Sequence, residues 1–179
     1  MKLLSIAFAA AADAAAKVAS LPNITDTYAF NSDWYSGYLK LSDDTLFSDK
    51  NLHYVFVESE NNKTTDPLMV WFNGGPGCSS MLALMQEHGP FVLDDDAVNF
   101  TRNPFPWTAR ANIIYLESPA GVGFSTAKSD EKVYNDFVQA EDAFKGLQKW
   151  FEVFPEYKTN KLFIAGESYG GIYAPYLSW

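Results

Sequence analysis

The sequence predicts an α/β fold, and two features of the chain point to this class. Short, almost wholly apolar runs stand at 68–72, 112–116 and 161–165, as expected of central strands that are buried on both faces. A long amphipathic helix pattern separates the second run from the third. Buried strands that alternate with helices build a sheet whose central strands are parallel, so we expect this helix to connect two parallel strands.

Two further strands are predicted before the first buried run. Residues 35–41 and 52–59 have strand composition, and the second segment alternates along the chain. The connection at 42–51 suits an antiparallel hairpin with a longer loop. We therefore expect an antiparallel hairpin that leads into the parallel strands.

The helix pattern between 129 and 155 is the clearest in the chain. Ser129 or Asp130 can cap its start, and Pro155 prevents its continuation. Apolar residues recur along it at spacings of three and four, which is the pattern of a helix with one stripe packed on a core. The stripe consists of Val133, Phe137, Ala140, Phe144, Leu147 and Phe151.

Composition limits the class of protein. The chain has 179 residues, 47% of them hydrophobic and 20% charged, which is ordinary for a globular domain and argues against disorder. Its net charge of −9 would repel a phosphate backbone, so nucleic-acid binding is not expected. No linker or repeat divides residues 21–179, which we interpret as part of one domain.

The first twenty residues have the layout of a secretory signal peptide. Lys2 precedes an apolar run at 3–12, and small residues follow as far as Ser20. The run is too short to cross a membrane, and no later stretch could do so. Three Asn-x-Ser/Thr sequons could accept glycan on the secretory route, which fits a lysosomal, vacuolar or extracellular protein. They begin at Asn23, Asn62 and Asn99.

A G-x-S-x-G motif at 166–170 supplies the candidate nucleophile, Ser168. The motif directly follows the buried run at 161–165 and precedes a predicted helix start at 171–174. This strand–turn–helix context is that of a nucleophile elbow, in which a serine sits on a sharp, strained turn. Glycines flank the serine because side chains there would collide with the neighbouring strand and helix.

A nucleophilic serine also needs hydrogen-bond donors for the oxyanion that forms on the attacked carbonyl. One predicted donor is the N–H of Tyr169, and the second is expected from the glycine-rich loop at 73–80, which follows another buried strand. Glycines let backbone N–H groups approach a ligand without an intervening Cβ. The same loop lacks the Gly-Lys-Ser/Thr of a phosphate-binding loop. A separate pair of glycines, Gly121 and Gly123, does not complete a dinucleotide-binding fingerprint, because Thr126 occupies the position of its third glycine. No metal cluster or cofactor site is predicted.

Three longer blocks resemble the signature blocks of the serine carboxypeptidases (peptidase family S10), which have the α/β-hydrolase fold. They read WFNGGPGCSS at 71–80, NIIYLESPAGVGFS at 112–125 and GESYGG at 166–171, in the order and spacing of that family. Smaller blocks at 36–39 and 103–107 are also similar. The resemblance begins near residue 30 and implies the N-terminal part of an α/β-hydrolase domain.

The resemblance implies a role for particular residues. Ser168 would be the acylated nucleophile, and the backbone amides of Gly75 and Tyr169 would form the oxyanion hole. Cys78 matches a cysteine that pairs with one later in the chain, which this sequence does not contain. The substrate would be the C-terminus of a peptide or protein. Its terminal carboxylate would be bound, in the family's pattern, by positions that match Trp71, Asn73, Gly74, Glu87 and Glu167.

Two glutamates at a carboxylate-binding site have a physical rationale. If Glu87 and Glu167 lie close together, their mutual repulsion favours retention of a proton by the pair. A protonated carboxyl can then donate a hydrogen bond to the substrate carboxylate. This hypothesis predicts that peptide C-termini bind best at acidic pH.

The rest of a catalytic triad is not found in the sequence. In this fold the triad runs Ser, Asp, His along the chain, but no Asp or His follows Ser168. We interpret His53 and His88, which precede it, as structural, and expect the chain of 1–179 alone to be inactive and unstable. Three alternatives stay open: an acyltransferase with the same nucleophile, a non-catalytic protein that retains the carboxylate-binding loop, and, more distantly, a lipase or esterase.

Overall fold

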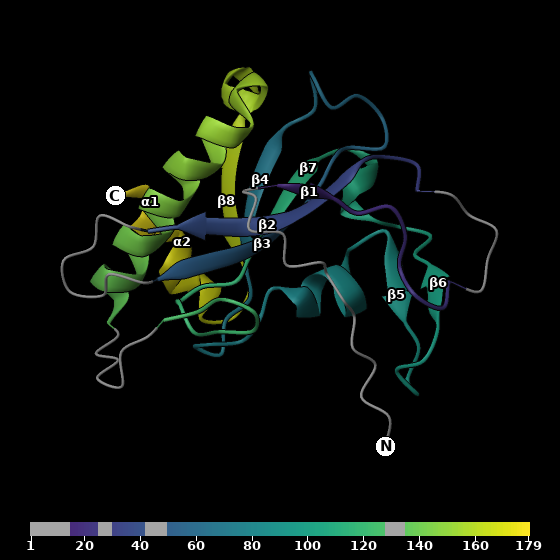
Figure 1. The fold of residues 1–179 in the computed structure, drawn as a ribbon, viewed down its shortest axis with the longest axis horizontal. Helices are drawn as coiled ribbons and strands as arrows, with labels where there is room; N and C mark the ends of the chain where they lie inside the picture. The colour runs from purple at the N-terminus through teal and green to yellow at the C-terminus, as the bar shows by residue number, and fades with distance from the viewer. Residues whose placement is uncertain (1–14, 25–29, 42–49, 128–134) are drawn as a thin grey trace.

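Six strands form the main sheet of the computed structural model, which describes residues 15–24, 30–41, 50–127 and 135–179. The three strands at one side of the sheet are joined to their neighbours in antiparallel pairs, and the parallel pairs lie at the other side (Figure 1). In spatial order the strands are β1 (Ala16–Lys17), β2 (Trp34–Lys40), β3 (Asn51–Val57), β7 (Asn112–Leu116), β4 (Leu68–Phe72) and β8 (Leu162–Gly166).

The predicted strands are all present in this sheet. The runs at 68–72 and 112–116 form β4 and β7, and the predicted hairpin is the antiparallel pair β2 and β3. Strand β4 pairs in parallel with both β7 and β8, so the chain returns to the same sheet after the helix between them. The carboxyl ends of β4, β7 and β8 therefore lie at one edge, where loops carry functional residues in open α/β sheets.

A hydrophobic core covers each face of the sheet. On one face, helix α1 (Asp136–Val153) packs Leu147 and Trp150 against β3 and β4. On the other face, Trp71 and Tyr115 belong to a second buried cluster with residues of the small hairpin β5 (Phe91–Leu93) and β6 (Phe100–Arg102). Figure 1 shows α1 and this hairpin on opposite sides of the sheet.

Helix α1 differs from its prediction in both its cap and its buried face. Asn135 caps it, because its side chain accepts a hydrogen bond from the Val138 backbone nitrogen at 3.0 Å. The predicted caps and Val133 lie outside the described residues. The buried face includes polar Asp142 and Gln139. Asp142 accepts from Lys50 Nζ at 2.7 Å, and Gln139 Nε2 donates to Ser118 Oγ at 3.0 Å, whereas Gln139 Oε1 is buried without a hydrogen-bond partner among the described residues.

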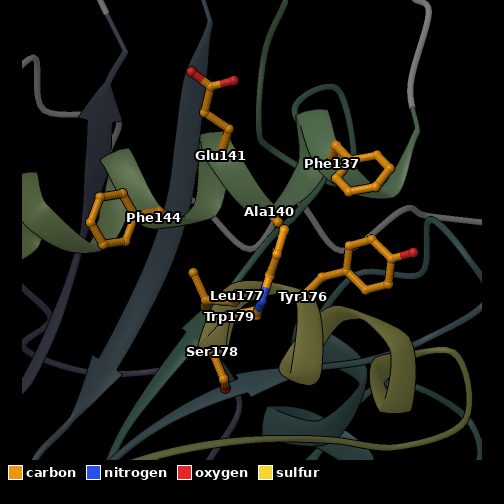
Figure 2. Close-up of a pocket in the computed structure, with 8 residues that line it drawn as sticks. All are labelled: Phe137, Ala140, Glu141, Phe144, Tyr176, Leu177, Ser178 and Trp179. Carbon is orange, nitrogen blue, oxygen red and sulfur yellow. The ribbon is translucent and has the colours of Figure 1, made fainter.

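The predicted apolar stripe of α1 is therefore only partly buried. Phe137 and Phe144 are 64% and 51% exposed, whereas Leu147 is buried. The two exposed phenylalanines line a hollow of about 420 Å³ between α1 and helix α2 (Gly170–Ser178). Figure 2 shows Tyr176 and Trp179 of the C-terminal segment beside them.

Strand β8 is also less buried than its apolar sequence predicts. Leu162 and Phe163 are 40% and 46% exposed. The reason is its position: in the described part of the chain, β8 is the last strand of the sheet and pairs only with β4. None of the helices in the described segments is long and apolar enough to cross a membrane.

The described structure begins inside the predicted signal peptide. Residues 1–14 lie outside it, but Ala16 and Lys17 form β1 and pair with β2. Val18 donates a backbone hydrogen bond to the Trp34 carbonyl at 2.9 Å, and Lys17 forms an ion pair with Asp33 at 2.8 Å. The part of the predicted leader from residue 15 onward thus lies against the sheet.

Candidate active site

The G-x-S-x-G motif forms a sharp turn between β8 and α2. Ser168 is exposed and has a φ of +53°, in the left-handed region that non-glycine residues rarely adopt. Such strain in a single exposed serine is a feature of the nucleophile elbow. The structure thus places the predicted nucleophile on the predicted kind of turn.

Steric contacts explain the two glycines of the motif. A Cβ at Gly166 would lie 2.6 Å from the Phe72 carbonyl oxygen and 2.9 Å from the Cα of Gly170. A Cβ at Gly170 would also lie 2.6 Å from the Phe72 oxygen. The elbow packs this closely against the end of β4, so side chains at these positions would push it out of place.

The glycine-rich loop at 73–80 meets the elbow. A Cβ at Gly74 would lie 2.4 Å from the Tyr169 backbone nitrogen and 2.8 Å from the Glu167 carbonyl oxygen. Gly75 follows with a φ of +106° and is exposed. The backbone of this loop therefore approaches the nucleophile, as the sequence predicts. Gly75 directly follows Gly74, the residue that meets the backbone of Glu167 and Tyr169.

The five residues predicted to bind a carboxylate come together around the Asn73 side chain. Asn73 Nδ2 donates to Glu87 Oε1 at 3.0 Å and lies 3.5 Å from Glu167 Oε1. The Gly74 backbone N–H also points to Glu167 Oε1 at 3.5 Å. Trp71 Nε1 donates to Asn73 Oδ1 at 2.9 Å and thereby orients the amide.

The two glutamates reach this cluster from separate elements. Glu87 is the last residue of a π-helical turn, Ala83–Glu87, and Glu167 precedes the nucleophile in the elbow. Both side chains are exposed, whereas Asn73 is buried. The arrangement is an open surface that presents an amide, a backbone N–H and two carboxyl groups beside Ser168.

Asp136 is a contact of the elbow that sequence reasoning missed. The Tyr169 hydroxyl donates to Asp136 Oδ1 at 3.1 Å, and this hydrogen bond raises the pKa of Tyr169. The bond ties the residue after the nucleophile to the start of α1. Because the two residues are far apart in the chain, no local pattern could have revealed the contact.

Both histidines are buried among other side chains. His53 is 1% exposed, with Ser36 and Glu117 as hydrogen-bond partners. His88 stacks on Trp107 at a centroid distance of 4.3 Å, and its Nδ1 lies 3.2 Å from the Tyr115 hydroxyl. Burial lowers the pKa of His88 to about 4, so it is neutral at pH 7.

The remaining predicted sites lie on the surface. Cys78 is exposed, and its pairing with a cysteine outside this chain stays a prediction. Asn23 and Asn62 are exposed and Asn99 is half-buried. No group of three or more potential metal ligands occurs in the described segments.

Comparison with known proteins reveals the family. A model of the serine carboxypeptidase family matches residues 22–179. Lysosomal protective protein of Mus musculus is 49% identical over 160 residues, which cover 88% of this chain and 32% of that protein. Serine carboxypeptidase-like 21 of Arabidopsis thaliana is 43% identical over 182 residues, which cover 98% of this chain and 36% of that protein. This chain thus spans about a third of the length of these relatives.

A solved structure agrees with the sequence matches. The crystal structure of Kex1(delta)p, a prohormone-processing carboxypeptidase from Saccharomyces cerevisiae, superposes with a TM-score of 0.72 and 30% identity. The superposition covers 90% of this chain and 37% of that chain. The mixed sheet with parallel central strands is therefore part of an α/β-hydrolase fold, as predicted. The chain belongs to the serine carboxypeptidase family, peptidase family S10.

Proposed function

We propose that this chain carries the nucleophile and the carboxylate-binding surface of a serine carboxypeptidase that releases C-terminal residues from peptides. One observation carries the proposal. Gly74 leaves no room for a Cβ against Tyr169 and Glu167, so the 73–80 loop and the elbow form one surface around Ser168. A carbonyl carbon at Ser168 would have the N–H groups of both segments beside it.

The proposed reaction proceeds through an acyl-enzyme. Ser168 Oγ attacks the last peptide carbonyl, and the backbone N–H groups of Gly75 and Tyr169 stabilise the negative charge on its oxygen. The C–N bond then breaks, and the C-terminal amino acid leaves with the proton taken from Ser168. Water hydrolyses the ester and restores the serine. The base His and its orienting Asp lie, in this proposal, in sequence beyond this chain, because the fold places them after the nucleophile.

The cluster around Asn73 supports recognition of a free C-terminus. The Asn73 amide and the Gly74 N–H are hydrogen-bond donors that suit a carboxylate. Both are now directed to glutamate oxygens, at 3.0 Å and 3.5 Å respectively. A bound substrate carboxylate would take over these donors.

The test uses the complete protein, with sequence beyond Trp179 included. A blocked dipeptide with a free C-terminal carboxylate is expected to release its last amino acid, and the corresponding C-terminal amide to react far more slowly. Equal cleavage of both, or cleavage of internal bonds only, would contradict the proposal. An ester formed with an added alcohol in preference to hydrolysis would identify an acyltransferase, and binding without turnover would identify a non-catalytic relative.

The two glutamates predict how a carboxylate substrate is bound. Glu87 Oε1 accepts from Asn73 Nδ2 at 3.0 Å and Glu167 Oε1 lies 3.5 Å from the same nitrogen, so both compete with the substrate carboxylate for this donor. Glu87→Gln removes a negatively charged competitor and keeps a side chain of similar size. The KM for a peptide with a free carboxylate is therefore expected to be lower in Glu87→Gln than in the parent at pH 7.

The matched control for this measurement is Glu156→Gln. Glu156 is an exposed glutamate in the turn that precedes β8, at the other end of that strand from the elbow. Its KM at pH 7 should equal that of the parent. The explanation is wrong if the KM of Glu87→Gln also equals that of the parent.

We also propose that the protein enters the secretory route. The predicted leader, the three sequons and the likeness to a protein named for the lysosome support this placement. Ala16 and Lys17 pair with β2, so cleavage at the end of the predicted leader, after Ser20, would remove β1 from the edge of the sheet. Cys78, exposed in the described structure, would form its disulfide there with a cysteine beyond this chain.

A further inference from the structure

A line of buried hydrogen bonds runs across the sheet to the 73–80 loop. His53 Nε2 lies 3.0 Å from Ser36 Oγ, and His53 Nδ1 lies 2.9 Å from Glu117 Oε2. The other carboxylate oxygen, Glu117 Oε1, accepts a hydrogen bond from Ser79 Oγ. These residues come from β2, β3, the end of β7 and the loop after β4, which is also the spatial order of those strands.

The Ser36–His53–Glu117 array has the connectivity of a catalytic triad but no access for a substrate. Ser36 is 4% exposed, His53 1% and Glu117 0%. A peptide bond cannot reach a serine inside a sheet, so the array does not act as a second nucleophilic site. The array continues to half-buried Ser79, which lies in the loop that meets Ser168.

Glu117 is held in one position from several sides. Besides His53, the Phe124 backbone nitrogen donates to its Oε2 at 2.8 Å. A Cβ at Gly123 would lie 1.8 Å from Glu117 Oε1, so only glycine leaves room for the carboxylate. A buried carboxylate with this many donors is a rigid anchor, because moving it would leave several buried polar groups unsatisfied.

The anchor acts on the part of the loop that follows Gly75. Ser80 Oγ donates to the Leu116 carbonyl at 2.7 Å, and the Cys78 N–H donates to the Gly74 carbonyl at 2.9 Å. The hydroxyl groups of Ser79 and Ser80 thus fasten the end of the loop to the end of β7: Ser79 donates to the Glu117 side chain, and Ser80 donates to the Leu116 backbone carbonyl. Between these contacts and Asn73, Gly75 is exposed and has a φ of +106°.

We infer that Glu117, oriented by His53, is a positioning residue that sets the Gly75 N–H in the oxyanion hole through its hydrogen bond with Ser79. The inference rests on the proposed function, because the amide of Gly75 matters only if the loop stabilises an oxyanion. Oxyanion donors must meet a developing charge at 2.7–3.1 Å, and a misplacement of about 1 Å can cost about 100-fold in rate. Loss of the Ser79 contact should therefore affect kcat more than KM.

The test is Ser79→Ala in the complete protein, assayed on a blocked dipeptide with a free carboxylate. We expect kcat to fall about 10- to 100-fold with KM within about threefold of the parent, and Ser79→Thr, which keeps the hydroxyl, to recover most of the loss. Ser59→Ala is the matched control: Ser59 also bonds a carboxylate, Asp66 Oδ2 at 2.5 Å, but on the loop that leads into β4, away from the carboxyl end of the strand. Its kcat should equal that of the parent.

A double-variant cycle tests whether Ser79 acts through Glu117. Glu117→Asp keeps the charge but withdraws the carboxylate from Ser79, so its kcat should also fall. Adding Ser79→Ala to Glu117→Asp should then lower kcat little further. A double variant whose loss of kcat equals the product of the two single losses would show that Ser79 does not act through Glu117. Parent-like kcat in Ser79→Ala would overturn the inference and leave carboxypeptidase activity in place. An inactive parent would overturn the proposed function and the inference together.

Discussion

Replacement of Ser168 by alanine in the complete protein is expected to lower kcat by at least about 10⁴-fold. The hydroxyl oxygen of Ser168 forms the ester bond of the acyl-enzyme, and alanine has no atom that can replace it in that step. The turn leaves Ser168 exposed with a φ of +53°, so alanine there should keep the fold. The measurement is the release of the C-terminal amino acid from a blocked dipeptide, together with a thermal unfolding midpoint.

Ser178→Ala provides the control for this loss. Ser178 is an exposed serine on α2 whose hydroxyl donates to the Ala174 carbonyl of the same helix at 2.7 Å. Its kcat should match that of the parent. The chain of residues 1–179 alone should be inactive both with Ser168 and with the Ser168→Ala substitution. The hydrogen-bond partners of His53 and His88 in the described structure are Ser36, Glu117 and Tyr115, so neither histidine is placed as a base for Ser168. Hydrolysis by purified 1–179 that Ser168→Ala abolishes would disprove this.

Gly74→Ala is expected to lower kcat/KM by at least about 100-fold. Its Cβ would lie 2.4 Å from the Tyr169 nitrogen and 3.0 Å from Ser168 Cβ. The clash involves the backbone, so it is relieved only if the 73–80 loop and the elbow move apart. That movement separates the Gly75 and Tyr169 amides and also displaces the Gly74 N–H from the carboxylate site. Both kcat and KM should therefore change.

The control substitutes a glycine on the other side of the nucleophile. A Cβ at Gly171 meets no atom of the described structure within 4 Å, and the residue lies in α2, where alanine is favoured over glycine. Gly171→Ala should therefore keep its activity and stability. If Gly74→Ala were as active as Gly171→Ala, the close contact between loop and elbow would not exist in the working enzyme.

Much of the fold could be predicted from local sequence. Apolar runs at 68–72 and 112–116 correspond residue for residue to β4 and β7, and the G-x-S-x-G turn follows β8 as expected. These features depend on neighbours in the chain: an apolar run needs a buried strand, and a serine between glycines fits a turn without room for side chains. The burial of β8 was overestimated, because apolar sequence cannot show which strand lies at the edge of the described sheet.

The predicted site depended on resemblance as well as on spacing. Asn73, Glu87 and Glu167 meet at one amide nitrogen, yet nothing in their spacing along the chain states that they do. The hydrogen bond from Tyr169 to Asp136 and the array that ends at Ser79 had no local signature. Each joins elements that become neighbours only when the sheet has formed.

Local sequence was enough to locate strands β2, β3, β4, β7 and β8, most of helix α1 and the nucleophile turn, because these follow from periodicity and from the backbone freedom of glycine. Which polar side chains are buried depends instead on contacts that exist only in the folded chain. Asp142 lies inside because Lys50 reaches it, and Glu117 lies inside because His53 and Ser79 do. Burial of a charged group depends on partners within hydrogen-bonding distance in space, and sequence separation does not fix that distance.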